Sequence, residues 1–436
     1  MQALLSYDDA PPLGAPLRYF LTAPLFAILA GLLLLYAGTD LFASRWTPAA
    51  LAFTHLLTAG FMLQAMLGSL QQLLPVVVGA NLARPLQVAT WVHAAVTPGA
   101  LFLAAAFLLE APLLFGLAVG LLGAGVALFV VAAARALRGM AASNPTLIGL
   151  KTGILGLIVT AVSGLALAVA LGWSLDWPLA QLTDLHLGWG FMAWNGIVLA
   201  AVALVVVPMF QITPEYPAWF GRRFVAAALG CVLLWTLADL AGWSGPAVLL
   251  AAAMVASGAV FCGVTLRVLR RSKRPVHDAT HHFWNLSMAS GLLACAVWLA
   301  AQLLPAVNAW PRWPLLFGAL LLFDGFVSVT IGMLYKIVPF LVWLHLQSRG
   351  ARRVAAPNMK KVLPQTRIDR QLRAHLAACA LLLLAVVWPV WFVYPAGVAL
   401  IVSNGWLLRN LLHATAVYRS HLAVIAAADE KLTAQK

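Results

Sequence analysis

Long apolar stretches, separated by short polar breaks, run along almost the whole sequence. About twenty apolar residues in an α-helix cross the hydrocarbon core of a bilayer, so this pattern predicts an all-α, polytopic integral membrane protein. We expect about twelve transmembrane helices, at residues 16–37, 47–78, 86–109, 112–134, 148–173, 178–211, 220–242, 245–268, 281–304, 313–345, 371–391 and 394–415.

Composition supports a single transmembrane domain over residues 1–436. Of these residues 63% are hydrophobic and only 9% are charged, whereas soluble domains are about 25% charged. The longest polar segments are expected to be a basic loop at 346–370 and a tail at 416–436. The four cysteines are far apart in sequence and form no CxxC motif, so we interpret them as ordinary small apolar residues: Cys231, Cys262, Cys295 and Cys379.

The distribution of positive charge predicts the orientation of the chain. If both termini lie on one side, every Lys and Arg except Arg45 and Arg312 lies in or beside a connection on that side. Lys and Arg are retained in the cytoplasm, which predicts a multi-pass protein of the bacterial inner membrane with both termini cytoplasmic. The net charge of +14 then indicates which connections face the cytoplasm, and the expected partner of the chain is the lipid bilayer. The charge is spread over short loops without interleaved aromatic residues, so we expect no nucleic-acid partner.

An internal repeat suggests how the helices are grouped. The segments GSLQQLLPVV (68–77) and GMLYKIVPFL (332–341) both place a proline seven residues after a glycine, near the inner end of their helices. Span 6 also resembles span 2, because GFM follows a histidine in both and a proline comes later. We therefore expect three pseudo-symmetric four-helix units, at 16–137, 148–268 and 281–415; chance recurrence of Gly, Pro and Leu is the alternative.

Two histidines stand out by their depth in the membrane. His55 and His186 each lie about 12 Å below the outer surface, on helices that the repeat makes equivalent. Two neutral imidazoles at one depth can supply both axial nitrogens to a haem iron, or part of a copper site. Neighbouring candidates for cofactor contact are Gly60, Met62, Trp189 and Gly190, although close helix packing explains glycines equally well.

A carboxylate is also expected inside the membrane. Asp324 lies roughly 16 Å into span 10, near the bilayer midplane. It is a candidate for a proton path, or a neutral group held by a hydrogen bond in a packed interface.

These features together resemble subunit I of the haem-copper oxidases, most nearly the branch of cbb3-type oxidases and nitric oxide reductases. His55 with Gly60 and Gly68 is similar to the family's low-spin haem segment, and His186 through LGWGF to Pro208 is similar to its copper-ligand helix. The segment GFVSVTIGMLYKIVPFL (325–341) resembles the part of helix 10 that follows the family's haem ligands.

The departures from the family pattern limit the function that the resemblance implies. Span 7 has no histidine pair, and Leu315 and Phe317 stand where the family has haem ligands. The resemblance therefore implies a divergent relative that binds haem b through His55 and His186, for electron transfer or a response to nitric oxide, without a complete oxygen-reducing centre. Whether copper is present stays open.

Partners and alternatives follow from the same features. Acidic residues outnumber the two arginines on the outer side, which fits a basic periplasmic cytochrome or respiratory subunits: Asp40, Glu110, Asp176, Asp184 and Asp239. Asp184, two residues before His186, could also orient that imidazole. The alternatives are a twelve-helix transporter or channel without a redox cofactor, and a cofactor-free scaffold of a respiratory complex.

Overall fold

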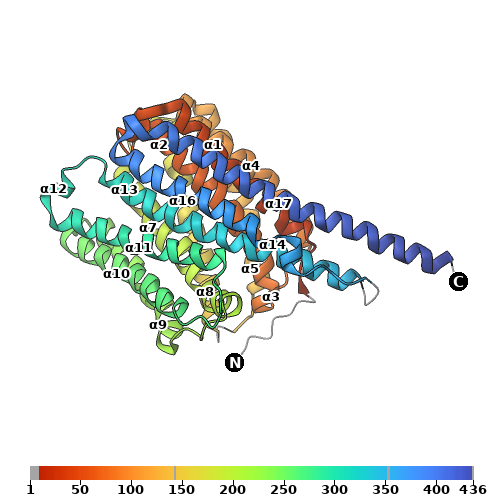
Figure 1. The fold of residues 1–436 in the computed structure, drawn as a ribbon. Helices are drawn as coiled ribbons and strands as arrows, with labels where there is room; N and C mark the ends of the chain where they lie inside the picture. The colour runs from red at the N-terminus through yellow and green to blue at the C-terminus, as the bar shows by residue number, and fades with distance from the viewer. Residues whose placement is uncertain (1–8, 142–143, 351–353, 435–436) are drawn as a thin grey trace.

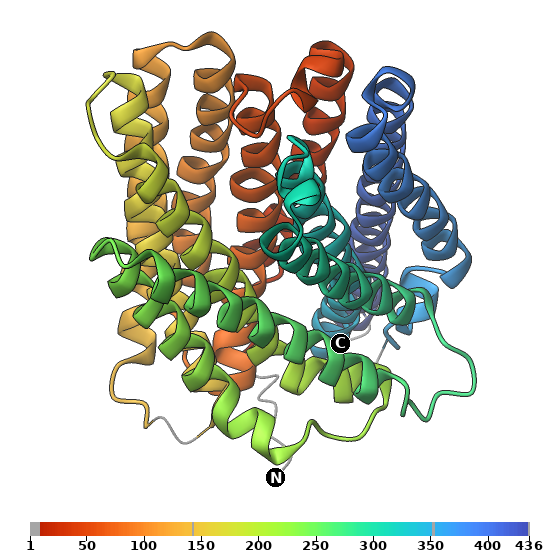
Figure 2. The ribbon, with the colours of Figure 1, turned by 90° about the vertical axis from the view of Figure 1, so that its left-hand side faces the viewer.

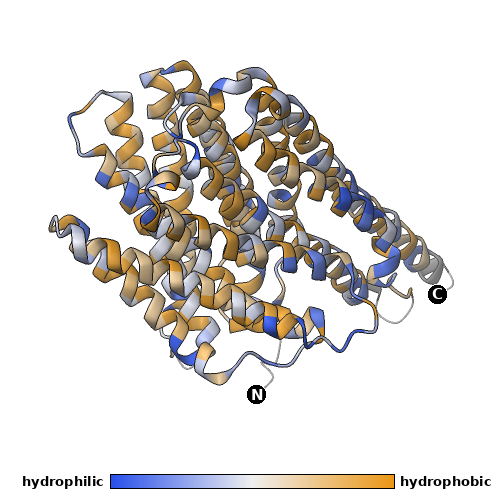
Figure 3. Ribbon diagram, turned by 60° about the vertical axis from the view of Figure 1, so that its left-hand side comes forward, coloured by the Kyte–Doolittle hydropathy of each residue, from blue (hydrophilic) through white to orange (hydrophobic). Residues whose placement is uncertain are grey.

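The protein is all-helical and crosses the membrane many times. The computed structural model describes residues 9–141, 144–350 and 354–434, and these contain helices and connections but no strand (Figure 1). Twelve helical segments in these ranges are long and apolar enough to span a bilayer, as the hydrophobic pattern predicted. Side chains along the helices are largely hydrophobic, and hydrophilic residues collect toward the connections (Figure 3).

Nine of the twelve spans contain one principal α-helix, and three are built from several consecutive pieces. The nine helices are α1 (Gly14–Ala37), α4 (Pro85–Leu109), α5 (Pro112–Leu137), α6 (Pro145–Gly172), α9 (Ala218–Leu240), α10 (Ser244–Leu269), α11 (Ala279–Leu303), α16 (Gln365–Val387) and α17 (Pro389–Ala434). The composite spans are span 2 with α2 (Pro48–His55), η3 (Leu56–Met62) and α3 (Leu63–Val78), span 6 with α7 (Leu179–Gly188), η4 (Trp189–Gly196) and α8 (Ile197–Gln211), and span 10 with α13 (Trp313–Gly318), η5 (Ala319–Val327) and α14 (Ser328–Gly350). Short helices in the connections are η2 (Gly38–Phe42), α12 (Pro305–Asn308) and α15 (Met359–Val362).

The last two spans differ from the expected boundaries. Span 11 begins and ends earlier than 371–391, and α17 runs for 46 residues in place of the expected span 394–415 with a separate tail. Much of the expected loop 346–370 is helical, because α14 continues to Gly350 and α15 and α16 occupy 359–362 and 365–370. Residues 351–353 of that loop and 435–436 of the tail lie outside the described ranges. In Figure 1 the C-terminal part of α17 projects away from the bundle.

The two ends of the bundle carry different connections. We call the end that holds the connections 79–84, 138–144, 212–217, 270–278 and 351–364 the basic face, and the other end the opposite face. An even number of spans places the beginning of α1 and the end of α17 on the side of the basic face. On the opposite face, Arg312 donates hydrogen bonds to the carbonyls of Phe42 (3.2 Å) and Val387 (3.3 Å), so this exceptional arginine ties three connections together.

Spans 2, 6 and 10 are the most enclosed part of the bundle. In each of them 56% of the most apolar stretch is buried, compared with 17–50% in the other nine spans. The remaining helices pack around them in chain order, with α4 on α5, α5 on α6, α9 on α10, α10 on α11 and α16 on α17. The ring closes where α1 packs on α17, and α9 and α10 run obliquely across one side of the bundle (Figure 2).

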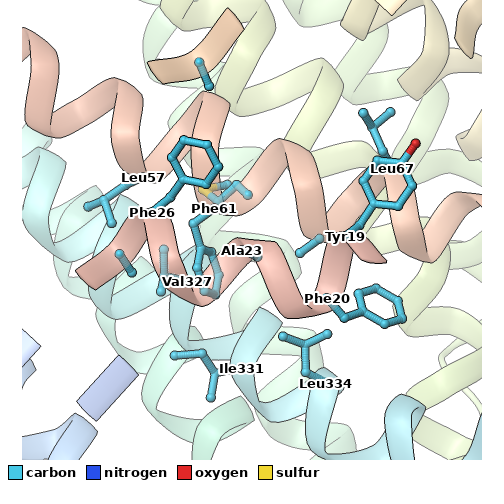
Figure 4. Close-up of a cluster of buried hydrophobic side chains, with 14 of the residues drawn as sticks. Tyr19, Phe20, Ala23, Phe26, Leu57, Phe61, Leu67, Val327, Ile331 and Leu334 are labelled. Carbon is cyan, nitrogen blue, oxygen red and sulfur yellow. The ribbon is translucent and has the colours of Figure 1, made fainter. Parts of the chain in front are cut away.

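Small residues allow the closest helix contacts. A Cβ atom added to Gly31 of α1 would lie 2.9 Å from the carbonyl oxygen of Gly397 in α17. A Cβ atom added to Gly397 would likewise lie 3.0 Å from the carbonyl oxygen of Gly31. Inside the ring, Phe26 and Ala23 of α1 meet Leu57 and Phe61 of span 2 in a packed apolar cluster that also includes span 10 (Figure 4). This packing fixes span 2 against α1 over its whole length.

A charged cluster ties spans 6, 8, 9 and 10 together at the basic face. Asp278 caps α11 and accepts contacts from Lys336 of α14 (2.6 Å) and Arg274 (3.0 Å). Arg274 also donates to the carbonyl of Phe210 at the end of α8 (2.8 Å). Burial alone raises the pKa of the Asp278 carboxyl, but the hydrogen bond and charge of Lys336, with Thr280 and Arg274, bring that pKa below its ordinary value.

Candidate functional site

Each of the three central spans contains a π-helical segment at a similar depth. These segments are η3, η4 and η5, and they lie four spans apart. π-Helical turns are rare and are frequent at functional sites, because the extra residue turns neighbouring side chains away from the regular helical positions. His55 directly precedes η3, and His186 lies three residues before η4. The three distorted spans are the same three that the predicted repeat relates to one another, and the grouping into three four-helix units stays a prediction.

The structure brings His55 and His186 together. Their ring centres are 6.3 Å apart, and the two ring planes differ by only 20°. His55 is supported on its other side by Phe107 of α4, whose ring centre lies 5.0 Å away. Two residues that are 131 positions apart in the sequence are therefore neighbours in the structure.

The hydrogen bonds of both rings leave one nitrogen free for a ligand. The Nδ1 atom of His55 bonds to the Leu51 carbonyl (2.8 Å), and Nδ1 of His186 bonds to the Thr160 carbonyl of α6 (2.9 Å). A carbonyl can only accept, so in each ring Nδ1 carries the hydrogen and Nε2 has an exposed lone pair. A metal-binding histidine has this arrangement, in which a backbone carbonyl fixes the tautomer and the ring orientation.

A glycine positions the His186 ring. A Cβ atom at Gly164, one helical turn beyond Thr160, would lie 2.7 Å from Cε1 and 3.0 Å from Nδ1 of His186. The ring therefore lies directly on the α6 backbone, where the Thr160 carbonyl can reach it. The signal in the sequence is a stripe of small residues on α6, at 149, 153 and 156, that packs against span 6, and it continues to Gly164.

The two histidines line a large and mainly apolar cavity. Its volume is about 900 Å³, and it extends between spans 2, 6 and 10 and toward spans 7 to 9. Ligand pockets of about 300–1,000 Å³ accept organic molecules of the size of a drug or cofactor. At the opposite face the cavity reaches Arg45, Asp184 and Asp239, so its charged groups collect at one end.

Three of the predicted cofactor residues lie on this cavity and three do not. His55, His186 and Gly190 are part of its wall. Gly60 faces α1, because a Cβ atom there would lie 2.3 Å from Cδ1 of Phe26. Two further candidates also point elsewhere, since Met62 borders a separate pocket of about 130 Å³ and the indole of Trp189 donates to the hydroxyl of Thr236 (2.9 Å).

Asp184 and Phe317, which were both considered in the sequence, lie on the cavity wall but bind neither histidine ring. Asp184 lies on the cavity wall, but the Nδ1 partner of His186 is the Thr160 carbonyl, so Asp184 does not orient that ring in the way we expected. Phe317 also lines the cavity, and it precedes Pro339 by 22 residues, the spacing between His186 and Pro208. By this spacing, a phenylalanine stands in span 10 at the position that corresponds to His186 in span 6.

Asn195 was missed by the sequence analysis and lies on the same wall. Its Nδ2 donates to the Gly190 carbonyl five residues earlier (2.7 Å), which satisfies a backbone acceptor within the π-helical segment. Its Oδ1 is buried without a hydrogen-bond partner. A polar residue within an apolar stretch was the available signal in the sequence.

Asp324 lies close to the cavity but not on its wall. Its neighbours Phe323 and Gly325 line the cavity, whereas the Asp324 side chain is only 1% exposed. One carboxyl oxygen, Oδ1, has no hydrogen-bond partner.

The site matches no known metal centre within the described residues and no known protein family. Within the described ranges, no group of three or more His, Cys, Asp or Glu side chains is arranged to hold a metal ion. A haem requires fewer protein ligands, because its porphyrin supplies four nitrogens and the protein supplies the axial ones. No protein-family model matches the sequence, and no curated protein matches it either.

Proposed function

We propose that this membrane protein binds one haem b between His55 and His186 and uses it for electron transfer. The observation that carries the proposal is the neighbouring pair of imidazoles, with ring centres 6.3 Å apart, nearly parallel planes and both Nδ1 atoms bonded to carbonyls. Two metal–nitrogen bonds of about 2 Å, with each nitrogen about 1 Å from its ring centre, separate two facing imidazole centres by about 6 Å. The observed separation fits this value.

The cavity suits the rest of a haem. A porphyrin is a flat apolar ring with two carboxylate groups at one edge, and the cavity is apolar except at the end that holds Arg45. Arg45 is one of only two basic residues on the opposite face, where it lies over the Trp46 ring at 4.6 Å. We infer that Arg45 receives the propionates, which would orient the ring edge toward that face.

The number of axial ligands favours electron transfer over gas binding. A haem held by two imidazoles exchanges electrons between ferrous and ferric iron and has no vacant coordination position. A response to nitric oxide would require one histidine to leave the iron, and the carbonyl bonds of both rings resist that movement. Exposed acidic residues on the opposite face would attract a basic electron-transfer partner: Asp40, Glu110, Asp176 and Asp184.

Absorption spectroscopy of the purified protein tests the proposal. We expect Soret and alpha bands of a low-spin haem b that are lost in His55→Ala and in His186→Ala. The matched control is His345→Ala, because Nδ1 of His345 bonds to the carbonyl four residues earlier (2.8 Å), as in His55, but Nε2 bonds to the Pro11 carbonyl (3.0 Å). This variant should keep the full spectrum.

Electron paramagnetic resonance gives a second test of the same geometry. Because the imidazole planes differ by 20°, the oxidised haem should give the rhombic low-spin signal of parallel ligand planes, not the highly anisotropic signal of perpendicular planes. A folded protein that stays colourless after haem is supplied would refute the proposal. It would favour a transporter or a cofactor-free scaffold.

A further inference from the structure

A second buried polar cluster lies in the middle of the membrane between spans 10, 11 and 12. Its six side chains are each at most 4% exposed: Asp324, Ser328, Gln371, His375, Cys379 and Ser403. Cys379 was expected to be an ordinary apolar residue, but its Sγ lies 3.5 Å from Nε2 of His375, and its thiol interacts with the Asp324 carboxyl. The cluster combines a carboxyl, a thiol and an imidazole, the groups that exchange protons most readily in proteins.

Hydrogen bonds connect these groups in series through His375. Nε2 of His375 lies 2.7 Å from Oγ of Ser328 and 3.5 Å from Sγ of Cys379. On the other side of the ring, Nδ1 lies 3.4 Å from Oγ of Ser403. Gln371 donates to that hydroxyl at 3.3 Å and thereby completes the series.

The series is directed from the basic face toward the membrane centre. Gln371 lies only about 9 Å from the beginning of α16 at the basic face, whereas Cys379 is about 21 Å from it. Asp324 lies roughly 16 Å from the opposite face, counted along span 10. The imidazole of His375 is therefore the central member between the basic face and Asp324.

The surroundings of Asp324 require it to hold a proton. In the described part of the chain no Lys or Arg forms an ion pair with Asp324, and its Oδ1 has no hydrogen-bond donor. The aromatic rings of Phe283 and Phe323 lie 5.4 and 5.2 Å from the His375 ring, so the cluster is bordered by apolar groups and Asp324 has no cation beside it among the described residues. An unpaired carboxylate in such an apolar site is strongly disfavoured relative to the acid.

We propose that Ser403, His375, Cys379 and Asp324 form a proton-transfer chain that leads from the side of the basic face to Asp324, next to the cavity wall. A proton that arrives through Ser403 binds Nδ1 of His375, and the ring then releases its Nε2 proton to Cys379. Cys379 passes its own thiol proton to Asp324 in the ionised state that follows release of the Asp324 proton. Ser403, His375 and Cys379 each gain one proton and lose one, and Asp324 regains the proton that it had released. Ser328 offers a parallel contact at Nε2, and the same steps in reverse return the proton.

The proton-transfer chain ends at Asp324, next to the cavity. Its two sequence neighbours, Phe323 and Gly325, line the cavity that contains His55 and His186. A proton on Asp324 can therefore balance a change of charge inside that cavity. The chain consists of protein groups only, so it does not depend on the proposed haem.

Infrared spectroscopy of the full-length protein in lipid vesicles tests the chain. We expect a carbonyl stretch of a protonated carboxylic acid at neutral pH that disappears in Asp324→Asn and persists in Asp40→Asn, which alters an exposed acid. We also expect Cys379→Ala to remove a hydrogen-bonded component of the S–H stretch, a spectral region without other protein bands.

The rate at which this acid exchanges with D₂O tests proton transfer itself. Exchange should be at least about tenfold slower in His375→Gln and in Ser403→Ala, because each variant removes one link of the series. His345→Gln is the matched control, since that histidine bonds only to backbone carbonyls. If both chain variants exchange at the wild-type rate, or if no Asp324 acid band exists, the proposal is wrong. The haem spectrum of the same samples is a separate readout, so the two proposals can fail independently.

Discussion

The contact between Gly164 and His186 gives the sharpest prediction about the site. In Gly164→Ala the new methyl group would lie 2.7 Å from Cε1 and 3.0 Å from Nδ1 of His186. Carbon atoms do not approach so closely, so the ring must move by about 0.5–1 Å and tilt away from the Thr160 carbonyl. The histidine stays present, and only its position changes.

The size of the effect follows from two contributions. Weakening the Thr160 hydrogen bond costs about 1 kcal/mol, and crowding at a packed site costs about 1–3 kcal/mol. Together they reduce haem affinity by about 2–4 kcal/mol, which corresponds to about thirtyfold to about a thousandfold weaker binding. The fold itself should change less, because alanine is a better helix former than glycine by about 1 kcal/mol.

Haem titration of the purified apoprotein measures this difference directly. The control is Gly120→Ala in α5, where a Cβ atom meets nothing within 4 Å. We expect wild-type affinity for Gly120→Ala, greatly weakened affinity for Gly164→Ala, and similar melting temperatures for both. Equal haem affinity of the two variants would refute the idea that the α6 backbone holds the His186 ring in its ligating position.

Three other predictions concern packing, ionic contacts and ring orientation. Gly60→Ala should lower the free energy of unfolding by about 1–3 kcal/mol without shifting the absorption bands, because its methyl group meets Phe26. Adding Phe26→Leu should restore stability in the double variant. A spectral shift at unchanged stability would contradict this prediction. Asp278→Asn should lower the melting temperature at pH 7. Because the folded pKa of Asp278 lies below its unfolded value of about 4, its contribution is present above that pH and is lost as the pH falls through the folded pKa, so the variant and wild-type curves should converge in acid. Lys336→Met should raise the pKa of Asp278 and move the acid transition to higher pH, and an unchanged transition would show that this ion pair does not stabilise the basic face.

The sequence predicted the features that depend on composition and periodicity. The twelve spans and the multi-pass arrangement follow from hydrophobic length, and the positions of glycine and proline related spans 2, 6 and 10 to one another. The similar depth of His55 and His186 followed from counting residues along two helices. These properties depend on axial rise, which is nearly constant in a helix.

Features that depend on helix rotation and on π-helical turns could not be predicted. The sequence analysis assigned Gly60, Met62 and Trp189 to the His55–His186 site from their proximity in sequence, whereas the structure turns Gly60 toward α1. It also gave no reason to place Cys379 beside Asp324, because their spans are separate in sequence and the rotation of each helix is set by tertiary packing. The length of α17 was missed because its final turns are polar, and hydropathy detects only the part inside the bilayer.

The three π-helical segments act as angular spacers between the two halves of each central span. One residue corresponds to about 100° of rotation in an α-helix. The extra residue of a π-helical turn therefore rotates the helix segment before it, which carries His55 or His186, relative to the helix segment after it, which contains the proline. Deletion of a single residue from η3 would give a more regular helix and leave the composition almost unchanged. It would nevertheless rotate His55 out of the gap that it shares with His186, so the irregularity of the helix, and not its apolar content, determines whether the two rings meet.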